Sequence, residues 1–214
     1  MGHEPENTLR SFKKALDLDV DMVELDVHVC KSGELVVIHD ETLDKNTNGT
    51  GLVADKMLTE LKSLDAGQRE KIPTLEEVLD LVNKQVPINI ELKGKGTAQP
   101  VAEMIKQYVK VKGWDYDHFL ISSFSNQELI DFYTLNKKVR LGVLNTDNGL
   151  DLADQINAFS VNFAKEVVTS ELVEQVHQTG RKVLVYTVNE EDDIKRMRDM
   201  GVDGIFCNYP DRIS

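Results

Sequence analysis

The stretch "VPINIELKGKGTAQPVAEMIKQYVKVKGWDYDHFLISS" (residues 86–123) decides the fold class. Residues 86–92 and 118–123 are short runs of apolar and β-branched residues, which predicts two strands. Residues 98–110 carry apolar side chains at helical spacing. A strand, a helix and a second strand in this order predict two parallel strands joined by a helical crossover.

The same alternation extends in both directions along the chain. We expect further strands at residues 21–27, 139–144, 158–163, 182–188 and 204–208. We expect helices at residues 7–18, 74–85, 125–136, 169–180 and 190–201, with a shorter, weaker helix at 148–156. This many units in about 200 residues favours a (β/α)8 TIM barrel over an open sheet. We therefore predict one α/β domain over residues 1–214.

Residues 28–73 break the alternation. They contain a hairpin strand, "ELVVIHD" (34–40), and the segment "NTNGTG" (46–51), which lacks P-loop spacing and is predicted to be a turn. An insertion on a strand-to-helix loop lies at the face of a TIM barrel where active sites form. The predicted barrel also has one strand fewer than the eight of a TIM barrel, because only seven barrel strands are expected and none precedes the first helix.

The charge balance restricts the partners. Lys and Arg number 25 and Asp and Glu number 37, giving a net charge of −12. Such a chain repels nucleic acid and anionic membranes, so we expect no nucleic-acid partner and no stable membrane association. An anionic substrate would need a metal ion or local cations. Cys30 and Cys207 are too few for a disulfide framework.

Acidic residues fall on the inner face of two predicted strands. Alternation in "DMVELDVHV" places Glu24 and Asp26 opposite the apolar set, and "INIELK" does the same for Glu91 and Lys93. Three carboxylates at neighbouring strand ends could bind a hard cation such as Mg²⁺ or Ca²⁺. The alternative is a solvated strand end whose acids pair with basic side chains.

His39 lies at the end of the inserted strand, where a turn would bring it to the mouth of the barrel. The adjoining Asp40 could orient or charge its ring, which favours acid or base catalysis. The alternative is a structural or surface histidine.

Six motifs together resemble the glycerophosphodiester phosphodiesterase family. They are, in order, "PENTLRSFKKAL", "DMVELDVHVCKSGELVVIHDETL", "GTG", "IPTLEEVL", "INIELK" and "GVDGIFCNYPD". The resemblance runs from about Pro5 to the C-terminus. It implies a TIM barrel with an insertion after the second strand, which agrees with the interruption at 28–73.

The resemblance also implies roles for particular residues. It makes His39 one of two catalytic histidines, with Glu6 supporting the site from the first loop, and Lys93 a phosphate contact. The implied metal ligands, for Mg²⁺ or Ca²⁺, are Glu24, Asp26 and Glu91.

The implied reaction is metal-dependent hydrolysis of a small glycerophosphodiester to glycerol phosphate and an alcohol. A neighbouring glycerol hydroxyl attacks phosphorus, and water then opens the cyclic phosphate. This chemistry needs neutralised phosphate oxygens, a base and an acid. A metal with Lys93 would meet the first need, and a histidine pair the other two.

The sequence departs from the family pattern at its front. Family members carry a His-Arg-Gly segment at the end of the first strand, and none is present here. His3 is a poor substitute, because a terminal residue is weakly fixed. We therefore expect Met1 to be an internal methionine, the first strand to be missing, and activity to be crippled. The unpaired barrel edges could also pair with another copy of the chain.

Three later departures bear on substrate preference more than on reaction type. "KNT" (45–47) replaces Arg-Thr-Thr, Tyr186 replaces Trp, and Asn208 replaces Asp. The main alternative function is a non-catalytic barrel that binds metal and phosphate. A related phospholipase acting on choline lipids is disfavoured, because no disulfide-braced loop or apolar membrane patch is apparent. The sequence leaves the head group, the metal and a cytoplasmic or periplasmic location open.

Overall fold

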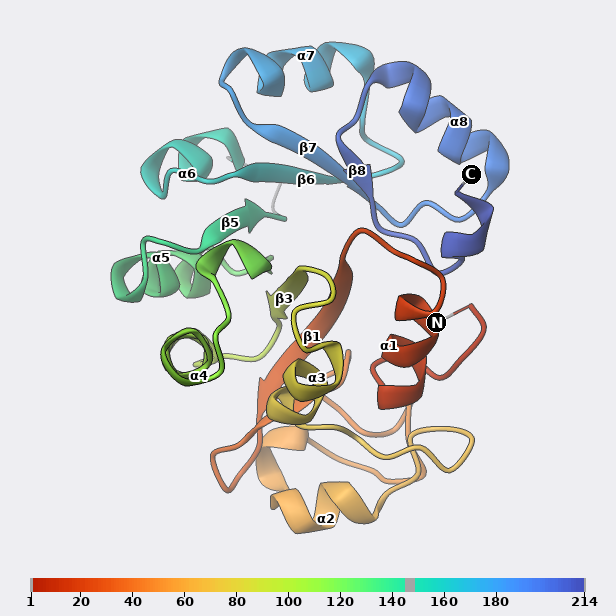
Figure 1. Ribbon diagram of the computed structural model, residues 1–214, viewed down its shortest axis with the longest axis vertical. Coiled ribbons are helices and arrows are strands. Elements are labelled where there is room, and N and C mark those ends of the chain that lie inside the picture. Colours follow the sequence, from red (N-terminus) through yellow and green to blue (C-terminus); the bar gives the residue numbers. More distant parts are fainter. Residues whose placement is uncertain (1, 145–148, 214) are drawn as a thin grey trace.

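The structure is a computed structural model that describes residues 2–144 and 149–213. Its strands form one curled sheet in the order β2-β1-β3-β4-β5-β6-β7-β8 (Figure 1). All neighbouring pairs are parallel except β1 and β2. The strands are β1 (Val23–Val29), β2 (Leu35–Val37), β3 (Ile88–Leu92), β4 (Phe119–Ser123), β5 (Arg140–Val143), β6 (Ser160–Ala164), β7 (Lys182–Tyr186) and β8 (Gly204–Ile205). The predicted parallel sheet and hairpin strand are confirmed.

Most helices lie on the outer side of the sheet, one precedes the first strand, and one belongs to the inserted segment (Figure 1). They are α1 (Leu9–Leu16), α2 (Leu58–Ser63), α3 (Leu75–Val82), α4 (Ala98–Val111), α5 (Asn126–Leu135), α6 (Gly149–Gln155), α7 (Ser170–Gln178) and α8 (Glu191–Met200). Every predicted helix is present. Part of the weak prediction at 148–156 lies outside the described residues. Helix α2 was not predicted.

Local sequence explains where several helices begin and end. Thr74 accepts a hydrogen bond from the amide of Glu77, whose carboxylate accepts one from the amide of Thr74, so a capping box starts α3. Ser125 and Thr169 cap α5 and α7 in the same position. Asn83 ends α3 at φ 43°, a left-handed conformation that Asn tolerates better than most residues.

The main core lies between the sheet and the helices. The outward side chains of β1 and β3 are all buried there: Val23, Leu25, Val27, Ile88, Ile90 and Leu92. Each such side chain contributes roughly 1.5–3 kcal/mol on burial. The alternate residues of the same strands face the barrel interior, as the period of two predicts.

The inserted segment is anchored by a small core of its own. Strand β2 is buried on both faces, with Leu35 and Val37 in the main core and Val36 in the second one. The second core comprises Cys30, Val36, Ile38, Leu43, Val53, Leu61 and Ile72. The segment after β2, which carries His39, therefore starts from a fixed element.

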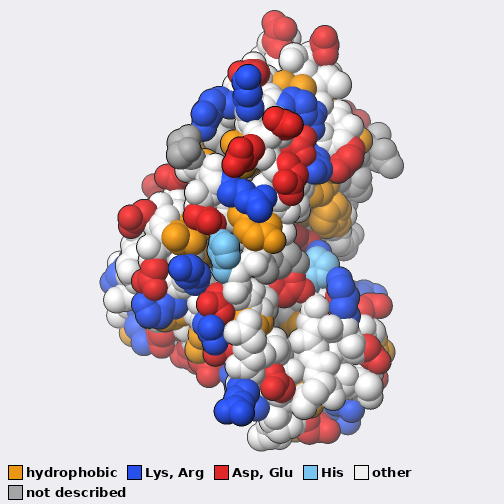
Figure 2. Space-filling model, turned by 90° about the vertical axis from the view of Figure 1, so that its right-hand side faces the viewer, with side chains coloured by type: hydrophobic (Ala, Val, Ile, Leu, Met, Phe, Trp, Pro, Cys, Tyr) orange, Lys and Arg blue, Asp and Glu red, His pale blue; other side chains and the backbone are white. Residues whose placement is uncertain are grey.

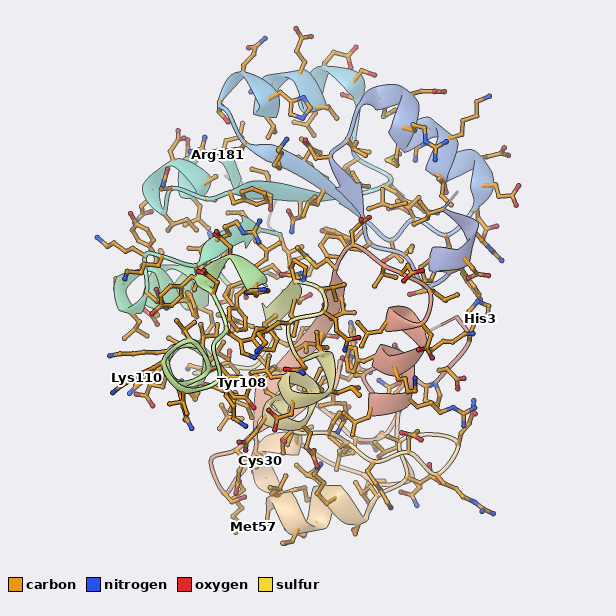
Figure 3. All side chains as sticks on the ribbon, viewed as in Figure 1. His3, Cys30, Met57, Tyr108, Lys110 and Arg181 are labelled. Atoms are coloured by element: carbon orange, nitrogen blue, oxygen red, sulfur yellow. The ribbon has the colours of Figure 1, made fainter. Side chains whose placement is uncertain are left out.

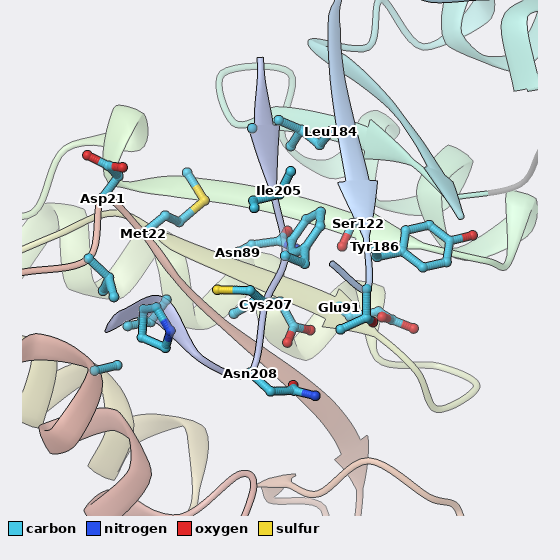
Figure 4. A pocket seen from close by; sticks show the side chains of 18 of the residues that line it. Asp21, Met22, Asn89, Glu91, Ser122, Leu184, Tyr186, Ile205, Cys207 and Asn208 are labelled. Carbon is cyan, nitrogen blue, oxygen red and sulfur yellow. The ribbon is translucent and has the colours of Figure 1, made fainter. Parts of the chain in front are cut away.

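The sheet is open between its two ends. Within the described residues β8 pairs only with β7, and β1 pairs with β2 and β3. A cavity of about 1030 Å³ reaches this gap, where Met22 of the β1 side faces Ile205 and Cys207 of the β8 side (Figure 4). The seven barrel strands agree with the sequence count. The expectation of a further strand in the gap stays a prediction.

Charged side chains of both signs cover the surface in view (Figure 2). Figure 2 shows acidic and basic side chains interspersed over one face, rather than a single basic area. No helix in the described part of the chain is long and apolar enough to cross a membrane.

Candidate functional site

Three carboxylates meet inside the barrel, at neighbouring positions of β1 and β3. Asp26 pairs in register with Glu91, and Glu24 lies two residues earlier on the same face of β1. One carboxylate oxygen from each of the three lies within 4.8 Å of the others. Three oxygen donors at this spacing could hold Mg²⁺ or Ca²⁺. The convergence predicted from strand alternation is therefore present.

Electrostatics favour a cation at this cluster. Burial raises the pKa of Glu24 well above the usual 4.5, and the charges of Asp26 and Glu91 raise it further. The Glu24 side chain is nonetheless exposed to solvent in the cavity, so solvent screens part of this effect. Burial and the charge of Asp26 likewise raise the pKa of Glu91. A divalent cation would offset both effects, because it favours the ionised carboxylates.

Lys93 brings one positive charge to the cluster. Its Nζ lies 2.9 Å from Oε1 of Glu91 and 3.5 Å from Oδ1 of Asp26. Burial by itself would lower the pKa of Lys93, but Glu91 and Asp26 outweigh that effect and the pKa is raised. Lys93 therefore stays protonated at neutral pH and can face an anionic substrate.

His39 lies beside Lys93, two residues after β2. Its Nδ1 is 2.6 Å from Oδ1 of Asp40, and its Nε2 is 3.2 Å from Nζ of Lys93. A protonated lysine can only donate, so Nε2 of His39 accepts and Nδ1 carries the proton shared with Asp40. The hydrogen bond from His39 lowers the pKa of Asp40. This tautomer leaves His39 with a basic nitrogen on the side of the carboxylate cluster.

Sequence reasoning missed Asn7, which orients one of the carboxylates. Its Nδ2 donates to Oδ2 of Asp26 at 2.9 Å, and its Oδ1 accepts from the amide of Asp26 at 3.3 Å. Asn7 has φ 55°, a left-handed conformation that aims its side chain at β1. The sequence feature that could have indicated this role is the position of Asn7 directly before Thr8, the cap of helix α1. Glu6 also lines the cavity, and its charge contributes to the raised pKa of Glu24.

Other side chains at the mouth have different surroundings. His3 also lines the cavity, but it is exposed and bonds through Nε2 to Oδ1 of Asp211 at 2.8 Å, near the edge of the molecule (Figure 3). Phe124 and Tyr186 both line the cavity, with ring centroids 5.7 Å apart in an edge-to-face contact. Figure 4 shows Tyr186 beside Glu91 and Ser122. Neither aromatic residue was included in the predicted site.

The sequence and fold match known proteins over nearly the whole chain. Residues 2–212 match the glycerophosphoryl diester phosphodiesterase family. A glycerophosphodiester phosphodiesterase of Caldanaerobacter subterraneus subsp. tengcongensis is 37% identical, covering 98% of this chain and 90% of the relative. The corresponding protein of Bacillus altitudinis is 38% identical, covering 99% and 92%.

A solved structure shares the fold. It is a phosphodiesterase of Oleispira antarctica in complex with the product sn-glycerol-3-phosphate, with a TM-score of 0.90 and 29% identity. The match covers 99% of this chain and 91% of that one. Family, relatives and structure agree with the motifs and with the barrel geometry described above, and the chain belongs to the glycerophosphoryl diester phosphodiesterase family.

Proposed function

We propose that this chain hydrolyses glycerophosphodiesters to glycerol phosphate and an alcohol, with a divalent cation and with His39 as the proton-transferring residue. The observation that carries the proposal is the meeting of Nε2 of His39 and Nζ of Lys93 beside three clustered carboxylates in one cavity. The names of the relatives support the substrate class.

His39 suits the role of base in the first step. A glycerol hydroxyl loses its proton to Nε2 of His39 while its oxygen attacks phosphorus and the bond to the leaving alcohol breaks. Asp40, bonded to Nδ1, then stabilises the positive imidazolium. The leaving alkoxide takes a proton from bulk water. In the second step water adds to phosphorus, releases one proton to bulk solvent and keeps the other on the new phosphate hydroxyl, while the imidazolium gives its proton to the glycerol oxygen that leaves phosphorus.

Lys93 and the carboxylates suit the handling of phosphate charge. The ammonium of Lys93 would neutralise a non-bridging oxygen, because it already points to the cluster. Glu24, Asp26 and Glu91 would hold the cation, which when bound acts as a Lewis acid toward phosphate. Asn7 would keep Asp26 in its orientation, and Glu6 would support the site from the first loop.

The proposal includes slow turnover by the 214-residue chain. Fast turnover needs a positioned donor that gives a proton to the leaving alkoxide in the first step. Among the described residues, His39 is the histidine whose ring contacts Lys93 beside the three carboxylates. His3 is engaged with Asp211 instead. The alternative function, a barrel that binds metal and phosphate without turnover, follows from the same geometry if no second acid acts.

The test is product formation from glycerophosphocholine with Mg²⁺, with Ca²⁺ and with EDTA. We expect choline and glycerol phosphate to appear in equal amounts with a metal and not with EDTA. His39→Ala, prepared in the same way, is the control, because any product that it still forms at the wild-type rate would come from contaminating activity. Metal-dependent thermal stabilisation without product release would favour the binding module, and equal turnover in EDTA would contradict metal dependence.

A further inference from the structure

His28 is a second histidine near the site, and the proposed reaction does not use it. It lies on the inner side of β1, and only 6% of it is exposed. Its Nε2 is 3.2 Å from the backbone carbonyl oxygen of His39. A carbonyl oxygen can only accept, so Nε2 of His28 carries a proton and donates it. This bond joins β1 to the segment that presents the His39 ring.

The other side of the His28 ring packs against the segment of Lys93. A Cβ built on Gly94 would lie only 2.9 Å from Nδ1 of His28 and 3.1 Å from its Cα. The amide of Gly94 also donates to the carbonyl of Val27 at 3.0 Å. The absent side chain of Gly94 therefore leaves the space that the imidazole fills.

We propose that His28 is a positioning residue, which fixes the main chain of His39 at the correct distance from Lys93. The imidazole sets this distance because it bonds the His39 carbonyl on one side and contacts Gly94, the neighbour of Lys93, on the other. The inference rests on the proposed role of His39. Catalytic groups held about 1 Å from their productive place can lose on the order of 10²-fold in rate.

Two substitutions at His28 separate hydrogen bonding from simple packing. His28→Gln keeps an N–H donor at similar reach, whereas His28→Leu keeps an apolar side chain of comparable bulk without a donor. The backbone amide of Asp40 reports directly, because it shares a peptide plane with the His39 carbonyl. We expect its NMR order parameter to fall from about 0.85 toward 0.6 or below in His28→Leu and to be restored in His28→Gln.

This readout needs no turnover, so it separates the inference from the proposed function. Where the chain is active, His28→Leu should lower kcat by roughly 10-fold or more with KM nearly unchanged, and His28→Gln should recover most of it. Absence of wild-type turnover would count against the proposed function and leave the order-parameter comparison intact.

Gly94→Ala gives an independent check that leaves His28 in place. The new methyl group should displace the imidazole and loosen the Asp40 amide as His28→Leu does. An unchanged order parameter in His28→Leu would overturn the proposal. Equal losses in the Gln and Leu variants would overturn it as well, because packing alone would then account for the effect.

Discussion

The two walls of the barrel have the same outer face and different inner faces. On β1 and β3 the inward residues include Glu24, Asp26 and Glu91, which open into the cavity. On β6 the inward residues are Ser160 and Asn162, both fully buried and hydrogen bonded to each other at 2.8 Å. Outward residues on both walls are buried and apolar. The difference teaches that every strand needs apolar outward side chains for the core, whereas the inward side chains can differ from strand to strand and can carry chemistry on some of them. We call the inner face of β1 and β3, with Glu24, Asp26 and Glu91, the charged wall, and the inner face of β6, with Ser160 and Asn162, the neutral wall.

The largest effect should come from removing His39, which lies beside the charged wall. We expect His39→Ala to lower turnover of glycerophosphodiesters by roughly 10²–10⁴-fold, the usual contribution of a positioned acid or base. Metal-induced thermal stabilisation should persist, since the carboxylates are untouched. The matched control is His177→Ala on α7, outside the cavity lining, which should keep its turnover. A loss below tenfold in His39→Ala would make His39 structural.

Glu91→Gln should remove most of the stabilisation that metal gives to the charged wall. A cation at about 100 times its Kd stabilises the folded state by roughly 2.7 kcal/mol, and removing one of three ligands should eliminate most of this. Thermal unfolding with and without Mg²⁺ or Ca²⁺ measures the shift. Glu174→Gln on the exposed side of α7 is the charge-matched control. A wild-type shift in Glu91→Gln would rule out this ligand.

The charged wall should make stability depend on pH in the metal-free protein. The pKa of Glu24 is higher in the folded chain than the usual 4.5, so protonation of Glu24 favours the folded state. This stabilisation is fully present below pH 4.5 and is lost as the pH rises through the raised pKa. Metal-free Tm should therefore decline over that interval, and less so in Glu24→Gln. Added Mg²⁺ or Ca²⁺ should reverse the decline. Identical pH profiles of Tm for the wild type and Glu24→Gln without metal would show that ionisation of Glu24 does not cause the decline.

The neutral wall should contribute stability without affecting metal. Ser160→Ala removes the hydrogen bond to Asn162, which should cost about 1 kcal/mol of unfolding free energy. Urea denaturation measures this loss, and the metal-induced shift in Tm should equal that of the wild type. A reduced shift would show that the two walls are coupled.

The smallest effect should come from His3. Its imidazole pairs with Asp211 at an exposed site, where solvent screens the interaction, so the pair contributes little to stability. His3→Ala should change turnover by less than about twofold, within the range of ordinary surface substitutions. A loss comparable to that of His39→Ala would identify His3 as the second proton-transferring group.

Periodicity was enough to predict most of the fold. Alternating strands and helices gave the parallel sheet, because each period fixes which side chains can be buried together. Helix α2 was missed because it has six residues in a turn-rich segment, where burial of Leu61 in the second core stabilises it. Strand alternation also predicted the inward placement of Glu24, Asp26 and Glu91.

The sequence by itself determined the inner face of each strand and the identity of the charged residues. Only the tertiary structure decided that Asn7 holds Asp26, that Lys93 meets His39 across 54 positions, and that the sheet is open between β8 and β1 in the described residues. The physical reason is that periodicity specifies the direction of a side chain from its own backbone. The distance between two side chains depends on the register and curvature of the whole sheet.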